Sequence, residues 1–216
     1  MPSRVKPMKT LTQYLKRSLL ISLIATSSTA TAQQAPIAND AGIAPSVNVD
    51  EQALVEQARS ITQQYGGALK KTLKATIMTS GPASAIRTCS VHAPGISEQT
   101  AQLTGWQVHR TSNKIRNPNN KPSLWETQVL QQFADKAERG APIDNLEHHE
   151  IVMENGEPIF RYMKAIKVQN LCLNCHGTHV SGPVKSAIRN VFPLDNATGY
   201  REGELRGAFT LKRPLK

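Results

Sequence analysis

Apolar side chains recur every three or four residues over the stretch that follows Asp50, the spacing of one face of an α-helix. The recurring positions are Leu54, Ala58, Ile61, Tyr65, Leu69, Leu73 and Ile77. Asp50 is suited to cap the N-terminus of this helix, and Gly81-Pro82 predicts its end. Gly66-Gly67 weakens the middle of the helix and predicts a kink there.

The pattern then changes to shorter elements. A second, short helix is predicted from Pro82, which suits a first turn, to a stop at Pro94-Gly95. The stretch "GWQVHRTS", residues 105–112, has the character of a strand, and "KIRNPNNKP", residues 114–122, is rich in turn-forming residues. These connections are short, as expected in a compact domain.

The clearest helix is "SLWETQVLQQFADKAERG", residues 123–140. Ser123 and Glu126 have the spacing of a capping box, and Gly140 is a natural C′ residue. The positions that share an apolar side are Leu124, Val129, Leu130, Phe133 and Ala137. We therefore predict an amphipathic helix with defined ends.

A β-hairpin is predicted after this helix. Strands at 148–154 and 157–168 flank Asn155-Gly156, the preferred pair for a type I′ turn. Pro158 favours an edge position near the turn. Residues 204–211, "ELRGAFTL", form a last predicted strand. The predicted fold is α+β, a single domain in which helices and a long N-terminal helix flank an antiparallel sheet.

The first 32 residues have the character of a secretory signal peptide. A basic start leads into the apolar run "LLISLIA", and Ala30-Thr31-Ala32 forms a cleavage site before Gln33. The run is far shorter than the roughly 20 residues that span a bilayer. We expect a cleaved signal at 1–32, a flexible leader at 33–49, a domain at 50–216, and export to a bacterial periplasm without a membrane span.

The charge of the chain changes once this segment is removed. The sequence has 26 basic and 16 acidic residues, a net charge of +10, but five basic residues lie in the signal, which leaves about +5. That excess is spread along the chain, with no basic stripe among aromatics, so we do not expect nucleic acid as a partner. Apolar content of 39% and 5% aromatics fit a small core that a cofactor assists.

The stretch "NLCLNCHGTH", residues 170–179, carries the candidate chemistry. Cys172, Cys175 and His176 have the Cys-x-x-Cys-His spacing of a c-type haem attachment site, in which two thiols bond the vinyl groups and the histidine binds iron. The spacing also allows a zinc site built from Cys172, Cys175, Cys89 and either His176 or His179, or a dithiol redox pair. Export favours one covalent haem c, and His179 is then expected at the surface.

Four stretches together resemble a known family, the exported c-type-haem proteins with a PAS-like fold that were long catalogued only as a domain of unknown function. They are "RTCSVHAPGIS", "VHRTSNKIRNPNNKPSLWE", "RYMKAIKVQNLCLNCHG" and "FPLDNATGYREGELRGAF". The resemblance implies one PAS-like α+β domain with one haem, in proteins regarded as redox or ligand sensors. No kinase, cyclase or receiver segment is attached, so output would pass to a separate, unidentified partner.

A haem held by His176 has a second axial position on its iron. Cys89 is our choice for it, because it is the one remaining thiol and lies in a stretch that matches the family. The alternative for Cys89 is a small buried side chain without function. His92, one turn later, is the best substitute as ligand. The other candidates are His109, His148, His149 and Met163.

Further residues could support the haem. Arg110 and Arg116 could bond its propionates, since a guanidinium matches a carboxylate. Trp125 and Tyr162 could line the pocket or fill the core. The motifs of a nucleophile–base pair, paired carboxylates or a phosphate loop do not occur, so an enzyme is not our first expectation. We expect a redox or gas-ligand sensor, with an electron carrier as the alternative and a haem enzyme as a third class. The long N-terminal helix could mediate a homodimer.

Overall fold

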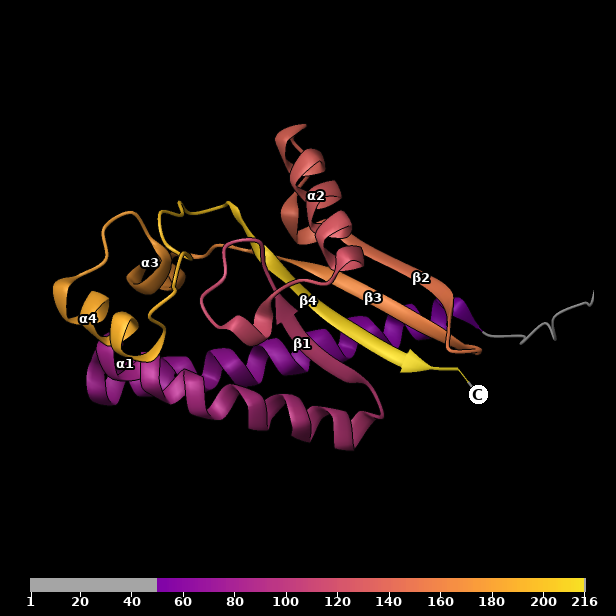
Figure 1. Cartoon of the computed structure of the whole chain (residues 1–216), viewed down its shortest axis with the longest axis horizontal. Coiled ribbons are helices and arrows are strands. Elements are labelled where there is room, and N and C mark those ends of the chain that lie inside the picture. Colours follow the sequence, from indigo (N-terminus) through magenta and orange to yellow (C-terminus); the bar gives the residue numbers. More distant parts are fainter. Residues whose placement is uncertain (1–49, 216) are drawn as a thin grey trace, which may run out of the picture. The chain divides into compact units, whose positions relative to one another are not determined.

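A four-stranded antiparallel sheet separates two layers of helix in the computed structural model, which describes residues 50–215 (Figure 1). The strand order is β1-β4-β3-β2, with β1 at Gln107–Thr111, β2 at Glu147–Glu154, β3 at Glu157–Lys167 and β4 at Leu205–Pro214. The α+β expectation is confirmed. The predicted signal peptide and leader lie outside the described residues.

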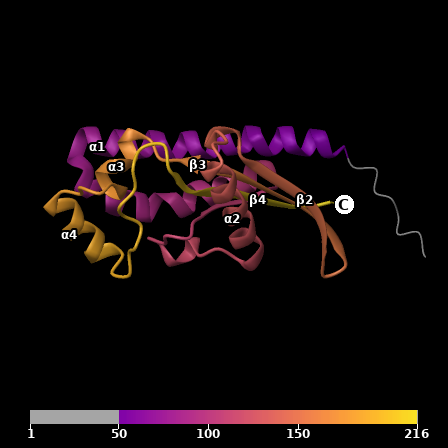
Figure 2. The ribbon, with the colours of Figure 1, turned by 90° about the horizontal axis from the view of Figure 1, so that it is seen from above.

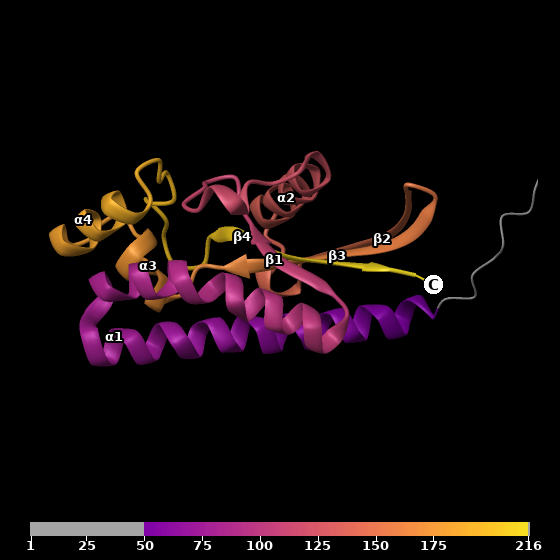
Figure 3. The same ribbon diagram turned by 60° about the horizontal axis from the view of Figure 1, so that its bottom comes forward.

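The helix α1, Glu51–Thr104, is a helical hairpin whose two arms run back along each other under the sheet (Figure 3). Asp50 caps it by accepting a hydrogen bond from the backbone N–H of Ala53 at 3.0 Å. The arms meet at Gly81, whose φ of 78° is in the left-handed region that favours glycine. The expected break at Gly81-Pro82 is therefore present, but the helix continues through Gly66-Gly67, where we predicted a kink.

The second arm of α1 runs past Pro94-Gly95, where we predicted its end. That prediction is wrong because tertiary contacts outweigh local propensity. Ile96 packs against the core, and the Ser97 hydroxyl donates a hydrogen bond to the carbonyl of Val108 in β1. These contacts hold the arm in helical form up to Gly105, which ends it in the left-handed region.

Each face of the sheet has its own core. On the α1 side, Val108, Leu211 and Tyr162 stand in one row across β1, β4 and β3. They pack against Leu54, Val55, Ala58, Ile61 and Tyr65 of α1, with Trp106 and Phe160 completing the cluster. On the other side, helix α2, Leu124–Glu138, packs Val129, Leu130 and Phe133 on Met163, Ala165 and Ala208. Because successive side chains of a strand point to opposite faces of the sheet, each strand contributes to both cores.

The predicted local signals around α2 and the hairpin are confirmed. Ser123 and Glu126 form the capping box, and Gly140 has a φ of 88° just beyond the helix end. Asn155 and Gly156 have φ values of 53° and 84°, as a type I′ turn requires. Pro158 did not indicate an edge strand, because β3 pairs with both β2 and β4. Pro158 is tolerated because it lies at the hairpin end of β3, beyond its ladder with β4.

The connection from β3 to β4 carries two further helices, α3 at Asn170–His176 and α4 at Gly182–Val191 (Figure 2). They lie beyond the sheet, beside the bend of α1, and a third core of Ile86, Cys175, Val180, Val184 and Ile188 joins them to it. We call α3, α4 and residues 70–90 of α1 the α3–α4 lobe. None of the helices between residues 50 and 215 has an apolar run that could cross a membrane.

Candidate functional site

Helix α3 carries the Cys-x-x-Cys-His motif on two turns at the inner side of the lobe. Cys172 is half-buried, and its sulfur accepts a hydrogen bond from the Gln169 backbone N–H at 3.4 Å. Cys175 is buried against Ile86 of α1 and the apolar side chains of α4. Burial raises the pKa of the Cys175 thiol, and Arg116 opposes that rise. Both thiols are free.

His176 is held in the orientation that a metal ligand needs. Its Nδ1 lies 2.6 Å from the carbonyl oxygen of Ala197, so the ring donates from Nδ1 and keeps the Nε2 lone pair free. The ring also packs edge-on against Tyr200, with the centroids 6.3 Å apart. Burial, together with Arg206 and Arg116, lowers the pKa of His176 well below its usual range. The imidazole is therefore neutral, the form that binds metal.

The loop after α4 fixes the end of α3. Gly177 forms a bridge with Tyr200, and the backbone N–H of Tyr200 donates to the carbonyl of His176 at 2.9 Å. A Cβ at Gly177 would approach the carbonyl oxygen of Leu173 to 2.7 Å, closer than side chains normally come. Glycine therefore allows the chain to leave α3 directly after the histidine.

Arg116 is the central polar contact of the lobe. Its guanidinium forms an ion pair with Asp195 at 2.8 Å and donates to the carbonyls of Cys175 at 2.6 Å and Ala197 at 3.4 Å. Only 10% of the Arg116 side chain and 8% of the Asp195 side chain are exposed. Arg116 thus ties the turn before α2 to α3 and to the loop that orients His176.

The second arm of α1 brings Cys89 towards the motif. Ile86, one turn earlier, packs in the same cluster as Cys175. The Cys89 sulfur is near enough to contribute to the raised pKa of Cys175. Burial raises the pKa of Cys89 itself, with Arg110 acting in the opposite direction. His92, one turn further on, is exposed to solvent.

Arg110 stands on the α1-facing side of β1, opposite Phe209 of β4. Its Nε is buried and has no hydrogen-bond acceptor among residues 50–215. Its charge lowers the pKa of Cys89, His176 and Arg206, so Arg110 lies near both candidate axial ligands. A buried Nε–H without an acceptor suits an anionic group such as a carboxylate.

The remaining candidate ligands lie elsewhere. His109 bonds Glu126 at 2.9 Å, and Met163 is fully buried in the α2-side core. His148 packs near Trp125, and His149 lies 3.3 Å from Glu51. His179 is exposed, as a surface residue would be.

The two aromatics considered for a haem pocket lie outside the α3–α4 lobe, Tyr162 on β3 and Trp125 on α2. The hydroxyl of Tyr162 donates to Glu147 at 2.8 Å, and the Trp125 ring lies under Arg161. No three Cys, His, Asp or Glu side chains gather as a metal site within residues 50–215, so the zinc site that the spacing allowed is not assembled there.

Sequence reasoning missed two residues that support His176. Asp195 pairs with Arg116. Arg206 in β4 donates to the Ser112 hydroxyl at 2.6 Å and lies over the Tyr200 ring, which packs on His176. Both residues fall in the stretch 192–209 that carried the family resemblance, and that was the signal available.

The fold and the site define an α+β domain with one Cys-x-x-Cys-His helix and an oriented, neutral histidine. The chain belongs to the Tll0287-like family, whose sequence model matches residues 23–214. A solved structure of similar fold is the crystal structure of the cyanobacterial haem-protein Tll0287. It is 25% identical, with a TM-score of 0.54, over 77% of this chain and 95% of that one. No curated protein matches the chain. The expected family resemblance is confirmed.

Proposed function

We propose that this protein is an exported, periplasmic haem protein that carries one covalent haem c and acts as a redox or gas-ligand sensor. The observation that carries the proposal is the arrangement of His176, whose Nδ1 bonds Ala197 while two thiols precede it on the same helix. A relative of similar fold is a haem protein, which supports haem binding here. A bound haem would supply an iron that changes oxidation state and accepts a second axial ligand.

The residues of the lobe have defined roles in this proposal. Cys172 and Cys175 would form the two thioether links, and His176 would bind iron through Nε2. Arg110 would bond a propionate through the guanidinium that has no acceptor for its Nε. Arg116 is a weaker candidate for a propionate, because its hydrogen bonds already go to Asp195, Cys175 and Ala197.

Cys89 is the proposed second axial ligand. A thiolate binds metal and carries negative charge, so Cys89 would favour ferric over ferrous iron. Reduction would weaken that bond and release the second arm of α1, which packs on α4 and β1 and could pass the change to the sheet. The chain thereby offers a route from a change in coordination to a movement of α1. A homodimer through α1 stays a prediction.

Intact mass is the first test of this function. Protein matured in a host that assembles c-type cytochromes should carry the added mass of one haem, and the Cys172→Ala/Cys175→Ala variant should not. A bare polypeptide mass for the natural sequence would remove the basis of the proposal.

Substitution at the sixth ligand separates Cys89 from His92. We expect Cys89→Ala to change the ferric optical and EPR spectra and to raise the midpoint potential, and His92→Ala to change neither. The reverse pattern would assign His92 as the ligand. If neither variant alters the spectra, both are excluded.

The alternative function is an electron carrier without a sensing role. The neutral, oriented His176 suits either function, so the behaviour of the axial ligands on reduction must distinguish them. A carrier keeps both axial ligands on reduction, whereas a sensor exchanges one. Spectra recorded through a potentiometric titration should show ligand exchange if the sensor proposal holds.

A further inference from the structure

The positive charge of the described chain is concentrated in the α3–α4 lobe. The sequence has no aspartate or glutamate between Glu56 and Glu98, and none between Glu157 and Asp195. Those stretches supply the helices of the lobe, whose basic residues are Lys70, Lys71, Lys74, Arg87, Lys185 and Arg189. Basic residues are spread along the chain, as expected, but those of the lobe have no acidic residue near them in the sequence.

At the other end of the domain, carboxylates are paired with basic side chains such as Arg59, Arg161 and Lys212. Glu147, Glu150 and Glu154 lie on β2, Glu157 begins β3, and Glu51 begins α1. The β2–β3 hairpin lies at the end of the molecule away from α3 and α4 (Figure 1). The domain thus carries its excess of positive charge at the end that holds the Cys-x-x-Cys-His motif. Such an asymmetry orients a charged partner before contact.

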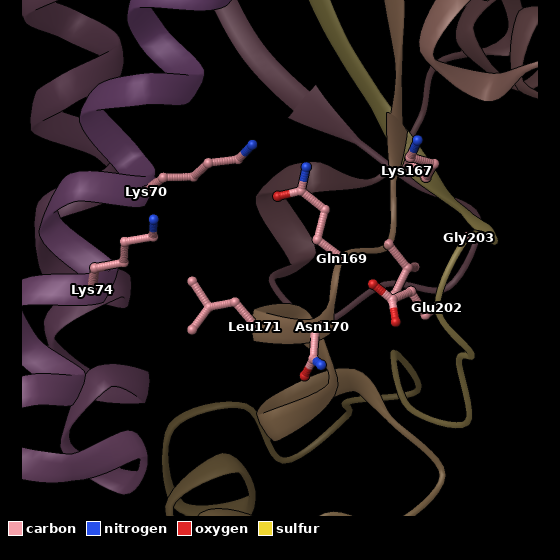
Figure 4. Close-up of a pocket in the computed structure, with 9 residues that line it drawn as sticks. Lys70, Lys74, Lys167, Gln169, Asn170, Leu171, Glu202 and Gly203 are labelled. Atoms are coloured by element: carbon pink, nitrogen blue, oxygen red, sulfur yellow. The ribbon is translucent and has the colours of Figure 1, made fainter.

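A groove of about 670 Å³ that includes Lys70 and Lys74 lies between α1 and the start of α3 (Figure 4). Lys70 and Lys74 project into it from α1, towards Gln169 and Leu171 on the opposite wall. Neither lysine takes part in an ion pair with any residue from 50 to 215. Glu202 is the one acidic side chain in the wall of the groove as the structure describes it.

The groove borders the motif directly. Asn170 and Leu171 in its wall immediately precede Cys172, whose side chain is only partly buried. If haem is linked through Cys172, the edge of the porphyrin that bears this link would lie next to the groove. Electron-transfer encounters between proteins use small, charged contact areas, and complementary charge governs their rate.

We propose that the Lys70–Lys74 groove docks an acidic redox protein that exchanges one electron with the haem carried by α3. The proposal rests on the function proposed above and names the partner of the same site. The partner's one-electron group, a flavin or a metal centre, is oxidised as ferric iron is reduced, and the reverse exchange restores it. A concave groove with amide walls fits protruding carboxylates better than a flat bilayer, which binds convex basic faces with aromatic anchors.

Charge reversal in the groove tests the docking surface. The test variant is Lys70→Glu/Lys74→Glu, and the matched control is Lys121→Glu/Lys136→Glu, which changes the net charge equally at exposed positions outside the lobe. Both proteins are first checked for haem mass and an unchanged spectrum. Failure at that step counts against the proposed function, whereas later failure counts against the groove alone.

Two readouts follow on the holoprotein. The reduced protein is oxidised in a stopped-flow instrument by anionic ferricyanide and by cationic tris(phenanthroline)cobalt(III). We expect the groove variant to slow ferricyanide about tenfold at low salt and to speed the cationic oxidant, while the control leaves both within about twofold. Equal effects of the two variants, or none, would overturn the proposal.

The second readout locates binding without electron transfer. A short oligoglutamate peptide, used as a probe of acidic protein surface, should shift the amide signals of Lys70, Lys74, Asn170 and Leu171 in NMR spectra. The groove variant should lose these shifts. Shifts elsewhere on the domain would show that acidic surfaces bind at another site and would overturn the proposal. Stronger binding to phosphatidylglycerol vesicles that depends on the same lysines would identify a membrane surface, and not an acidic protein, as the partner.

Discussion

The sheet and the α3–α4 lobe are stabilised in different ways. The sheet has a core on each face, four hydrogen-bonded strands, and carboxylates paired with basic side chains, as in the cluster of Glu147 with Arg59, Tyr162 and Lys164. The lobe has two short helices, a small core around Cys175, and no strand of its own. Its main polar contacts converge on a single side chain, Arg116.

This difference predicts which part of the chain the proposed haem would stabilise. Small units that bury little apolar surface usually need an added link such as a metal or a covalent group. The lobe leaves Arg110 Nε buried without an acceptor and orients a neutral His176 towards a ligand, whereas the sheet-side core is complete. We therefore expect haem to stabilise the lobe and to leave the sheet nearly unaffected. The following predictions test that division.

Loss of haem attachment should have the largest effect. In the Cys172→Ala/Cys175→Ala variant, amides of α3, α4 and the loop at 192–200 should lose most of their protection from hydrogen exchange. Amides of β3 and β4 should keep theirs, because local opening is set by local contacts. Hydrogen exchange read by mass spectrometry compares the two regions in one sample. Equal protection of the lobe with and without haem would contradict the comparison.

Removal of Arg116 should destabilise the α3–α4 lobe. Arg116→Ala leaves Asp195 buried without its partner, a change that costs about 3–5 kcal/mol in comparable sites. We expect faster exchange in α3 and the loop at 192–200 and a disturbed haem spectrum, with the sheet intact. Arg116→Lys should rescue little, because a lysine cannot reach several acceptors as a guanidinium fork does.

A matched control for Arg116 exists in the same lobe. Arg189 on α4 is exposed and bonds only Ser186 among the described residues. Arg189→Ala removes the same charge at the surface and should change stability by less than about 0.5 kcal/mol. If the two alanine variants behave alike, the lobe does not depend on the Arg116 contacts.

Glu147 tests the sheet side of the comparison. Hydrogen bonds from Arg59 and Tyr162 outweigh burial and lower the pKa of Glu147 from 4.5 to about 2. A carboxyl whose pKa falls on folding stabilises the protein above its unfolded value, so this contribution is present above pH 4.5 and is lost as pH falls towards 2. Glu147→Gln should cost about 2–3 kcal/mol at neutral pH and remove that part of the acid dependence.

Urea unfolding at neutral and acidic pH measures this effect. The haem spectrum should stay unchanged, since Glu147 lies on β2 and outside the lobe. Glu56→Gln, on the exposed side of α1, is the control and should keep the acid dependence of the natural protein. A change of the haem spectrum in Glu147→Gln would show that the two regions are coupled more tightly than their contacts indicate.

Local signals in the sequence predicted the sheet side well. Asp50, the Ser123–Glu126 capping box and Asn155-Gly156 each act through neighbours in the chain, so their residue types suffice. The extension of α1 past Pro94 could not be predicted in this way. It depends on Ile96 and Ser97 meeting a core and a carbonyl that lie on other segments.

In the candidate site too, local sequence signals predicted some residues and could not predict others. The spacing of Cys172, Cys175 and His176 identified their helix, because the chemistry requires that spacing. The Ala197 carbonyl that orients His176, the pairing of Asp195 with Arg116, and the unpaired Nε of Arg110 arise from loops that meet only in the fold. Residue type could suggest a propionate partner among the arginines, but only the contacts distinguish Arg110 from Arg116.

The smallest predicted effect concerns the two glycines where a kink was expected. Gly67 faces open space, so Gly67→Ala should stabilise α1 by about 0.5–1 kcal/mol through helix propensity. A Cβ at Gly66 would lie 3.0 Å from the tip of the Phe209 ring, which Tyr65 holds edge-on. Gly66→Ala gains the same propensity but displaces that ring, at a cost of about 1–3 kcal/mol, and should be destabilising. Thermal unfolding of the two alanine variants measures the difference. Equal gains in stability would mean that α1 packs less closely on the sheet at Gly66 than the structure indicates.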